Sequence, residues 1–462
     1  MKDLDFTRIH RYRFDDLYIV LDINSGSVHV IDDAFGTYLD LLEAETSLAD
    51  AQADMAAQVG PEDAADMAAQ LEQLVAQGLL FSAADFSEYA PHTEPIVKAI
   101  CLHMAHDCNL RCGYCFADSG AYGGPRGLMS AETGKAAIDF LMKASGHRTH
   151  VEVDFFGGEP LLNFEVCQEV AAYGYAQAAA HGKTLKCTLT TNGVLLTDEV
   201  QTWLNENNID AVLSLDGRPE VHNRMRTFVG GAPSYEAVVD KFQRFVASRD
   251  QKQYYLRGTY THYNTDFAED AMHMADDLGF IELSLEPVVA PMDAPYALQE
   301  ADKPTLLDNY ERLARHYLKR QEEGKGYHFF HFNIDFAGGP CLPKRLSGCG
   351  SGHDYLAVSP EGVLYPCHQF VGEDAYRMGD VWQGIENPAI AADFQQANVL
   401  SKPTCMACWA RYFCSGGCHA NNIRYGGGLN EPYAFGCDLQ RKRVECGLYL
   451  QIKQLLAAEN NE

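Results

Sequence analysis

The sequence predicts an α/β protein, in which a partial (β/α)6 barrel lies between an N-terminal winged-helix-like module and a C-terminal cysteine-rich domain. Short β-type runs open the chain, six apolar runs alternate with helical patterns in its middle, and nine of the 15 cysteines follow residue 340. A chain of 462 residues is also too long for one ordinary core. We therefore expect three domains, over residues 1–90, 91–330 and 331–462.

The first domain is expected to begin with strands and to continue with helices. Alternating apolar runs flank Asn24–Ser25–Gly26, which predicts a hairpin. Ala-rich helical sequence follows, and Gly60–Pro61 divides it, with Pro61 at a favourable first helical position. The strand near Val28–Ile31 is expected to leave an edge exposed, where an extended peptide could pair by strand addition. The segment SEYAPHTEP, residues 87–95, is typical of a linker.

The second domain is predicted from six successive strand-and-helix units, which favour a parallel sheet with helices on its outer face. Six units are fewer than the eight of a closed barrel, and functional side chains are expected at the carboxyl ends of the strands. The expected strands are 96–104, 151–156, 185–192, 209–216, 254–263 and 280–287, and the expected helices are 131–145, 163–181, 197–207, 235–248, 266–278 and 302–322.

The third domain is rich in cysteine and glycine between residues 338 and 446 and has few long periodic segments. We expect bound metal, rather than an apolar core, to hold this region together. A last helix is predicted over Arg441–Ala458.

Composition excludes several classes of function. The formal net charge of −28 offers no basic stripe for nucleic acid. The chain contains no apolar run of about 18 residues, so no membrane-spanning helix is predicted. The charged N-terminus does not resemble a secretory signal. A cytoplasmic protein is therefore expected. Since the cytosol keeps thiols reduced, clustered cysteines there indicate zinc or iron–sulfur ligation.

The stretch CNLRCGYCFA carries Cys108, Cys112 and Cys115 in the pattern C-x3-C-x2-C, directly after the first barrel strand. Three thiolates could hold three irons of a 4Fe–4S cluster and leave the fourth iron open, whereas a zinc site would need a fourth ligand at a regular interval. The pattern, with an aromatic residue before the last cysteine, resembles the radical S-adenosylmethionine (SAM) enzymes. That resemblance implies SAM on the open iron, and its reductive cleavage to a 5′-deoxyadenosyl radical.

Motifs at later strand ends extend this resemblance: GGEP at 157–160, TTNG at 190–193, SLDG at 214–217 and the arginine of HNRMRTF. In isolation each is typical of an ordinary loop or cap, but they recur in order at successive strand ends. No protein acid or base is singled out, because the cofactors carry the chemistry. By resemblance, the SAM-facing residues are Gly157, Gly158, Glu159, Thr191, Asn192, Ser214, Asp216 and Arg226.

The second cysteine group contains C-x12-G-x4-C and then C-x2-C-x5-C-x3-C. It resembles the SPASM extension, which holds two auxiliary 4Fe–4S clusters, so the resemblance implies three clusters in all. We assign Cys341 as a ligand of the first auxiliary cluster. The alternative is that one iron of this cluster stays open for a substrate thiolate. The remaining thiols, Cys101, Cys167, Cys187 and Cys446, are expected to be buried and inert. The implied ligands are Cys341, Cys349, Cys367 and Cys418 for the first auxiliary cluster and Cys405, Cys408, Cys414 and Cys437 for the second.

The N-terminal stretch LYIVLDINSGSVHVIDD resembles the peptide-recognition element of maturases for six-cysteine (SCIFF) peptides. This implies an enzyme that forms thioether crosslinks in a Cys-rich precursor peptide bound through its leader, with a reductant such as flavodoxin or ferredoxin. An anaerobic sulfatase maturase or a quinone-cofactor peptide maturase is the alternative with the same clusters. A non-catalytic electron carrier or a zinc-stabilised binding protein is the alternative from another class.

Overall fold

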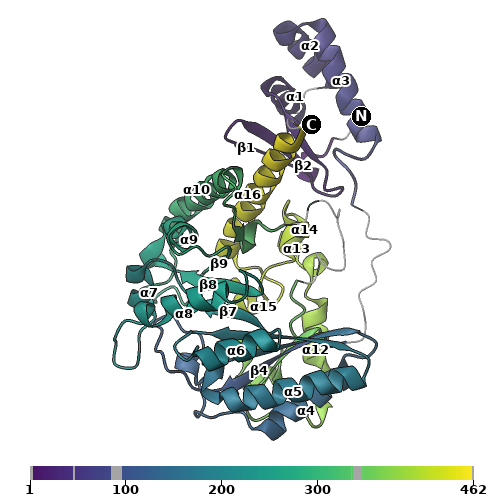
Figure 1. Ribbon diagram of the computed structural model, residues 1–462. Helices are drawn as coiled ribbons and strands as arrows, with labels where there is room; N and C mark the ends of the chain where they lie inside the picture. Colours follow the sequence, from purple (N-terminus) through teal and green to yellow (C-terminus); the bar gives the residue numbers. More distant parts are fainter. Residues whose placement is uncertain are drawn as a thin grey trace.

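The computed structural model describes residues 4–44, 47–84, 96–334, 336, 346 and 348–459. It contains a three-stranded sheet near the N-terminus and an 11-stranded sheet that forms the body of the protein (Figure 1). The predicted linker over 87–95 and Cys341 lie outside the described residues. Within the described residues, no helix combines the length and apolar character needed to cross a membrane.

The N-terminal sheet consists of β1 (Ile9–Phe14), β2 (Leu17–Asp22) and β3 (Val28–Ile31), all antiparallel. The predicted hairpin is confirmed, and Gly26 in its turn has a φ of 75°, which suits glycine. Because the order is β1-β2-β3, β3 is an edge strand as expected. Three helices follow, namely α1 (Asp33–Glu43), α2 (Leu48–Val59) and α3 (Pro61–Ala76).

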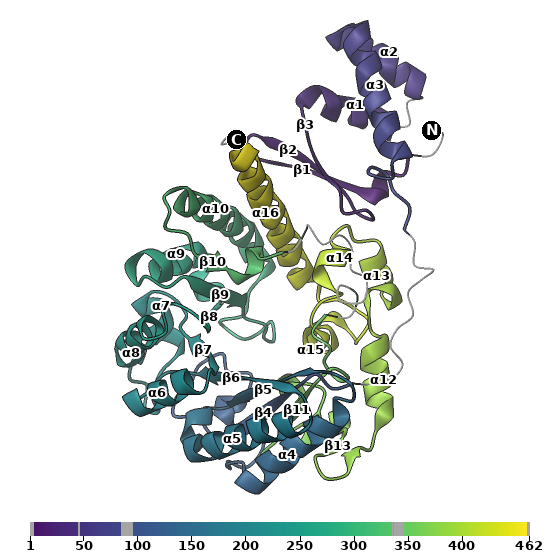
Figure 2. The same cartoon turned by 45° about the vertical axis from the view of Figure 1, so that its right-hand side comes forward.

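All six predicted barrel strands are present, parallel and adjacent in chain order. Their helices lie along the outer side of the curved sheet, which stays open (Figure 2). A short helix, α7 (Pro219–Met225), was not expected. The strands are β4 (Ala99–Ala105), β5 (His150–Gly157), β6 (Thr184–Thr191), β7 (Asp210–Ser214), β8 (Tyr254–Tyr260) and β9 (Glu282–Pro287), and the helices are α4 (Ala131–Ala144), α5 (Phe164–Ala180), α6 (Asp198–Glu206), α8 (Tyr235–Ala247), α9 (Phe267–Met272) and α10 (Lys303–Glu322).

The sheet continues beyond the barrel strands at both edges. On one side β10 (His328–Phe329) pairs with β9, and on the other β11 (Tyr355–Val358) pairs in parallel with β4. The strands β12 (Val363–Tyr365), β13 (Gly379–Asp380) and β14 (Gly384–Ile385) extend that edge. Leu356, Ala357 and Val358 are fully buried. The expectation that metal alone holds this region is therefore wrong for β11, which satisfies the open edge of β4 and joins the apolar core.

The cysteine-rich segment forms short helices: α12 (Pro388–Gln396), α13 (Pro403–Met406), α14 (Arg411–Cys414) and α15 (His419–Asn421). The last helix, α16 (Ala434–Glu459), begins at Ala434 rather than at the predicted Arg441. Gly436 weakens the helical pattern at that point in the sequence. As a consequence, Cys437 is presented from a rigid helix rather than from a loop.

The N-terminal module packs on the far end of α16, as both ribbon views show (Figures 1 and 2). Phe14 stacks on Tyr449 with ring centroids 4.0 Å apart. His10 stacks on Trp409 at 3.7 Å, and Trp409 follows Cys408 in the chain. The module is therefore attached to the helix and to the loop that carry the predicted ligands of the second auxiliary cluster.

Candidate functional site

A cavity of about 1070 Å³ lies at the carboxyl ends of the barrel strands, where functional residues were expected. Its wall combines the three-cysteine loop, the strand ends and the C-terminal region. Two cysteine groups that are far apart in the sequence therefore face one space. The cysteines that line it are Cys108, Cys112, Cys115, Cys349, Cys367, Cys414, Cys418 and Cys437.

The three-cysteine loop is held by backbone hydrogen bonds to the segment after α7. Arg111 N–H donates to the Thr227 carbonyl at 2.7 Å, and Gly113 N–H donates to the Met225 carbonyl at 2.8 Å. Burial raises the pKa of Cys108 to about 12 and that of Cys112 to about 11. Without metal these thiols are neutral, so an iron ligand set would form here with release of protons.

The GGEP motif lies where the backbone passes very close to that loop. A Cβ on Gly158 would lie 2.1 Å from the Asp107 carbonyl oxygen, and Gly157 has a φ of 120°. Any larger residue would therefore collide with the backbone that precedes Cys108. Both glycines line the cavity.

Glu159 is turned away from the cavity and is absent from its lining. Its side chain is 1% exposed and accepts hydrogen bonds from Thr191 Oγ1 at 2.8 Å, Asn192 N–H at 2.8 Å and Leu161 N–H at 3.1 Å. Burial raises its pKa to about 7, although these three hydrogen bonds act in the opposite direction. In this structure Glu159 fastens the end of β6 to the end of β5, while Thr191 and Asn192 line the cavity.

Asp216 has a similar supporting position and is 0% exposed. Its Oδ2 lies 3.0 Å from Arg226 Nε, in an ion pair whose alignment falls short of a hydrogen bond. The same oxygen accepts from the Tyr114 hydroxyl at 2.5 Å, and Oδ1 accepts from Thr259 N–H at 2.9 Å. Asp216 thus connects β7, β8 and the three-cysteine loop. Its partner Arg226 and the neighbouring Ser214 line the cavity.

The sequence did not single out the charged residues on the opposite wall, Arg257 on β8, Glu286 on β9 and Arg443 on α16. Glu286 Oε1 lies 3.0 Å from His331 Nε2, and its Oε2 lies 3.8 Å from Arg443 Nη2. Burial opposes ionisation of Glu286, but His331, Arg443 and Arg257 outweigh it and lower its pKa. Arg257 and Glu286 could have been predicted as site residues, because they lie on the last two predicted barrel strands. No local sequence pattern predicts that Arg443 lines the cavity.

His368 also lines the cavity and follows Cys367 directly. It lies among aromatic rings, 5.1 Å from Phe156 and 5.6 Å from Phe116 between centroids. Burial lowers its pKa to about 4, with Arg257 and Arg424 acting in the same direction. The imidazole is therefore neutral near pH 7.

Electrostatic interactions connect the described auxiliary cysteines to one another. Cys367 interacts electrostatically with Cys418 and Cys349, and burial raises its pKa to about 12. The pKa of Cys437 is also raised to about 12 by burial, and its thiol neighbours are Cys414, Cys405 and Cys408. Among the described residues, no three His, Cys, Asp or Glu side chains form a site for a single metal ion.

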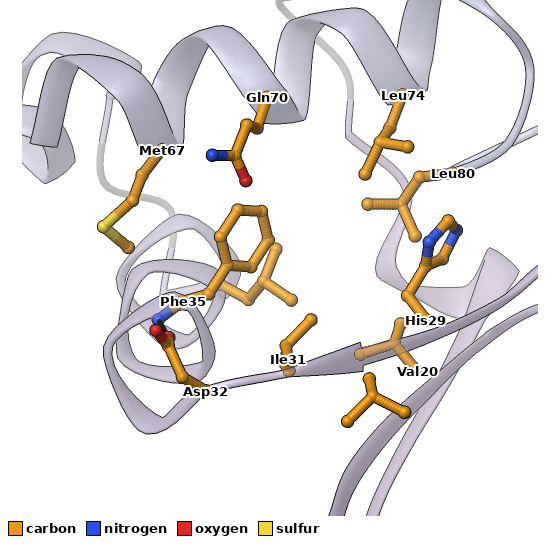
Figure 3. Close-up of a pocket in the computed structure, with 11 residues that line it drawn as sticks. Val20, His29, Ile31, Asp32, Phe35, Met67, Gln70, Leu74 and Leu80 are labelled. Atoms are coloured by element: carbon orange, nitrogen blue, oxygen red, sulfur yellow. Dashed lines mark hydrogen bonds between the residues drawn. The ribbon is translucent and has the colours of Figure 1, made fainter. Parts of the chain in front are cut away.

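A second pocket, of about 340 Å³, lies in the N-terminal module between β3, α1 and α3. Figure 3 shows Met67, Gln70 and Leu74 pointing from α3 toward Phe35 and Ile31. Apolar side chains line the pocket together with His29, Asp32 and Gln70, and it borders the free edge of β3, on which Val30 is 47% exposed.

Comparison with known proteins shows which enzymes this chain resembles. A family described as a 4Fe-4S single cluster domain matches residues 97–235, which include the three-cysteine loop. The radical SAM cyclopropyl synthase TigE of Paramaledivibacter caminithermalis is 21% identical over 384 residues, covering 79% of this chain and 75% of its own. A cysteine-type anaerobic sulfatase-maturating enzyme of Clostridium novyi is 22% identical over 332 residues, covering 68% of this chain and 86% of its own.

Solved structures agree with the fold. Native anSMEcpe with bound AdoMet superimposes with a TM-score of 0.64 at 19% identity, covering 79% of this chain and 99% of that one. Streptococcus suis SuiB bound to S-adenosylmethionine gives a TM-score of 0.51 at 16% identity, with coverage of 92% and 97%. The chain thus shares the partial-barrel fold of these structures and is similar in sequence to radical SAM and sulfatase-maturating enzymes. The resemblance to SPASM-type peptide and protein maturases that the cysteine spacing predicted is confirmed.

Proposed function

We propose that this protein installs Cys-derived thioether crosslinks in a ribosomally made, Cys-rich precursor peptide. One observation supports this most: eight cysteines from both predicted groups line one cavity, and a separate pocket borders a free strand edge in the N-terminal module. The first feature suits radical chemistry with nearby electron acceptors. The second suits capture of an extended peptide away from the reacting centre.

The residues present suit the cofactors that this function needs. Cys108, Cys112 and Cys115 would hold a 4Fe–4S cluster with one iron free for SAM. When bound and reduced, this pair of cofactors supplies a 5′-deoxyadenosyl radical that removes a hydrogen atom from carbon. The two auxiliary cysteine sets would hold two further clusters.

The chain's own residues would bind and orient SAM. Gly157 and Gly158 would face its methionine part from the cavity wall, where their close approach to the Ala105 and Asp107 backbone excludes a Cβ. Arg226 would bind the carboxylate, with Asp216 holding the guanidinium in place. Ser214 and Asn192 would donate or accept hydrogen bonds at the strand ends. In this arrangement Glu159 and Asp216 act mainly by positioning other groups, rather than by touching SAM.

Formation of the thioether needs electron acceptors. The carbon loses a hydrogen atom, the substrate thiol loses its proton, and a sulfur–carbon bond forms with one electron left over. Clusters held by the auxiliary cysteines that line the same cavity would accept that electron. A low-potential donor such as flavodoxin or ferredoxin would deliver the electron that starts each turnover.

The leader of the precursor would bind along β3 in the N-terminal module. An added strand gains backbone hydrogen bonds from the free edge, and apolar leader side chains would enter the pocket lined by Val20, Phe35 and Leu74. SuiB, which has been solved with its precursor peptide SuiA, matches 94% of this chain at a TM-score of 0.51. That coverage includes most of the chain, whereas the likeness to anSMEcpe covers 79%. This difference favours a peptide substrate over sulfatase maturation, the second candidate.

The test is a turnover assay with anaerobically reconstituted protein, SAM, dithionite and a Cys-rich peptide encoded beside the gene. We expect 5′-deoxyadenosine and a mass loss of about 2 Da per crosslink, because each thioether removes two hydrogens. Iron analysis should give about 12 irons per chain for three clusters. If the peptide stays unchanged while a sulfatase-derived peptide is oxidised, the second candidate replaces the first.

A further inference from the structure

Lys402 is a lysine with 0% exposure at the start of α13. Its Nζ donates to the Gly416 carbonyl at 2.9 Å, and the same carbonyl accepts from Asn422 Nδ2 at 3.1 Å. Lysines are almost never fully buried unless an anion balances them. The ammonium of Lys402 therefore needs a counter-charge.

No carboxylate supplies it: within the part of the chain that the structure describes, no ion pair joins Lys402 to an Asp or Glu. Burial lowers the pKa of Lys402, and the groups that would oppose this shift when ionised are four cysteines. An isolated buried ammonium is costly, and proteins pair it or neutralise it. The four thiols are Cys405, Cys414, Cys418 and Cys437.

These four cysteines come from both predicted auxiliary sets, Cys418 from the first and the other three from the second. A cysteine that binds iron does so as a thiolate, so the sets become anionic only when clusters occupy them. When loaded, these sites would supply the negative charge that Lys402 lacks.

The backbone near Gly416 is also shaped to hold an ammonium group. Gly416 has a φ of 83°, and a Cβ there would lie 3.1 Å from Lys402 Nζ. The segment between Cys414 and Cys418 thus wraps closely around the ammonium, and its geometry favours glycine. Lys402 and the cysteine loop are positioned by the same contacts.

We propose that Lys402 is a positioning residue that balances the charge of the auxiliary clusters and raises their reduction potentials. This rests on the proposed function, in which iron–sulfur clusters occupy the two sets. Adding an electron makes an anionic cluster more negative, and a fixed nearby cation favours that reduced form. The clusters are thereby suited to accept the electron released when the thioether forms.

The test compares Lys402→Met with Lys402→Arg, both in a background where Cys108, Cys112 and Cys115 are replaced by alanine. In that background only auxiliary clusters contribute to the spectra. Methionine keeps the apolar length and removes the charge, whereas arginine keeps the charge. Each full-length protein is reconstituted anaerobically, its iron and sulfide are counted, and its reduced clusters are titrated by EPR at controlled potentials.

With Lys402→Met we expect the one-electron reduction equilibrium to fall roughly tenfold, a shift of about 59 mV to lower potential. Loss of auxiliary iron in Lys402→Met, with iron retained in Lys402→Arg, would also support a charge-balancing role. Unchanged potentials and iron in Lys402→Met would overturn the proposal, as would equal defects in both variants, which indicate a steric role. Absence of auxiliary iron from the protein with Lys402 intact would instead refute the proposed cofactors.

Discussion

Replacing Val30 by aspartate tests whether the edge of β3 binds the leader peptide. Val30 is 47% exposed, so about half of its surface is still available for burial by a partner. Burying a whole valine is worth about 1.5–3 kcal/mol, which leaves roughly 1 kcal/mol to be gained at this position. A carboxylate placed there would lose that gain and would be desolvated without a partner, which costs at least about 1 kcal/mol more. We therefore expect binding to weaken by about 2 kcal/mol, or roughly 30-fold in Kd.

The assay is fluorescence anisotropy of a labelled synthetic leader titrated with the full-length protein. Val229→Asp is the matched control, because Val229 is 63% exposed and lies in a loop of the barrel. It adds the same charge and should leave leader binding unchanged. A Kd for Val30→Asp within twofold of the parent would refute leader binding at this edge. Equal losses in both variants would show that the added charge, and not the site, weakens binding.

Three further predictions concern the barrel. Asp216→Asn should lower the free energy of unfolding of the apo-protein by about 3 kcal/mol, because Arg226 stays buried without its counter-ion. In urea titrations, adding Arg226→Met should recover part of this loss. Strictly additive effects of the two substitutions would contradict the ion pair. Glu159 has a pKa of about 7 instead of 4.5, so the folded state binds its proton more readily and stability should fall as the pH rises from 4.5 to about 7. Glu159→Gln should remove this part of the pH dependence, and parallel pH profiles for the two proteins would argue against it. Cys167→Ala should leave the iron content unchanged, because this thiol is buried in the core and outside all three ligand sets. A loss of iron in elemental analysis would contradict its assignment as inert.

The class of protein was readable from short-range patterns. Cys108, Cys112 and Cys115 lie within eight consecutive residues, and an iron–sulfur loop requires that proximity whatever surrounds it. The six barrel strands were equally readable, because short β-type runs alternate with helical patterns along this part of the chain. Turn chemistry at Gly26 and Pro61 was local too, so the hairpin and the start of α3 were predictable.

Long-range packing decided what these patterns left open. Pairing of β11 with β4 joins residues more than 200 positions apart, and no local signal announces it. The direction of a side chain is also a tertiary property: Glu159 follows the cavity-lining glycines, yet the donors on β6 turn it inward.

The sequence by itself determined which chemistry the chain can support, because ligand identity and spacing are properties of neighbouring residues. Only the tertiary structure decided how that chemistry is surrounded. It placed eight cysteines from both predicted groups around one space, brought Arg443 from the last helix to Glu286, and buried Lys402 against Gly416, between Cys414 and Cys418. Burial and charge balance arise from segments that meet only in the folded chain, so they cannot be read from intervals along it.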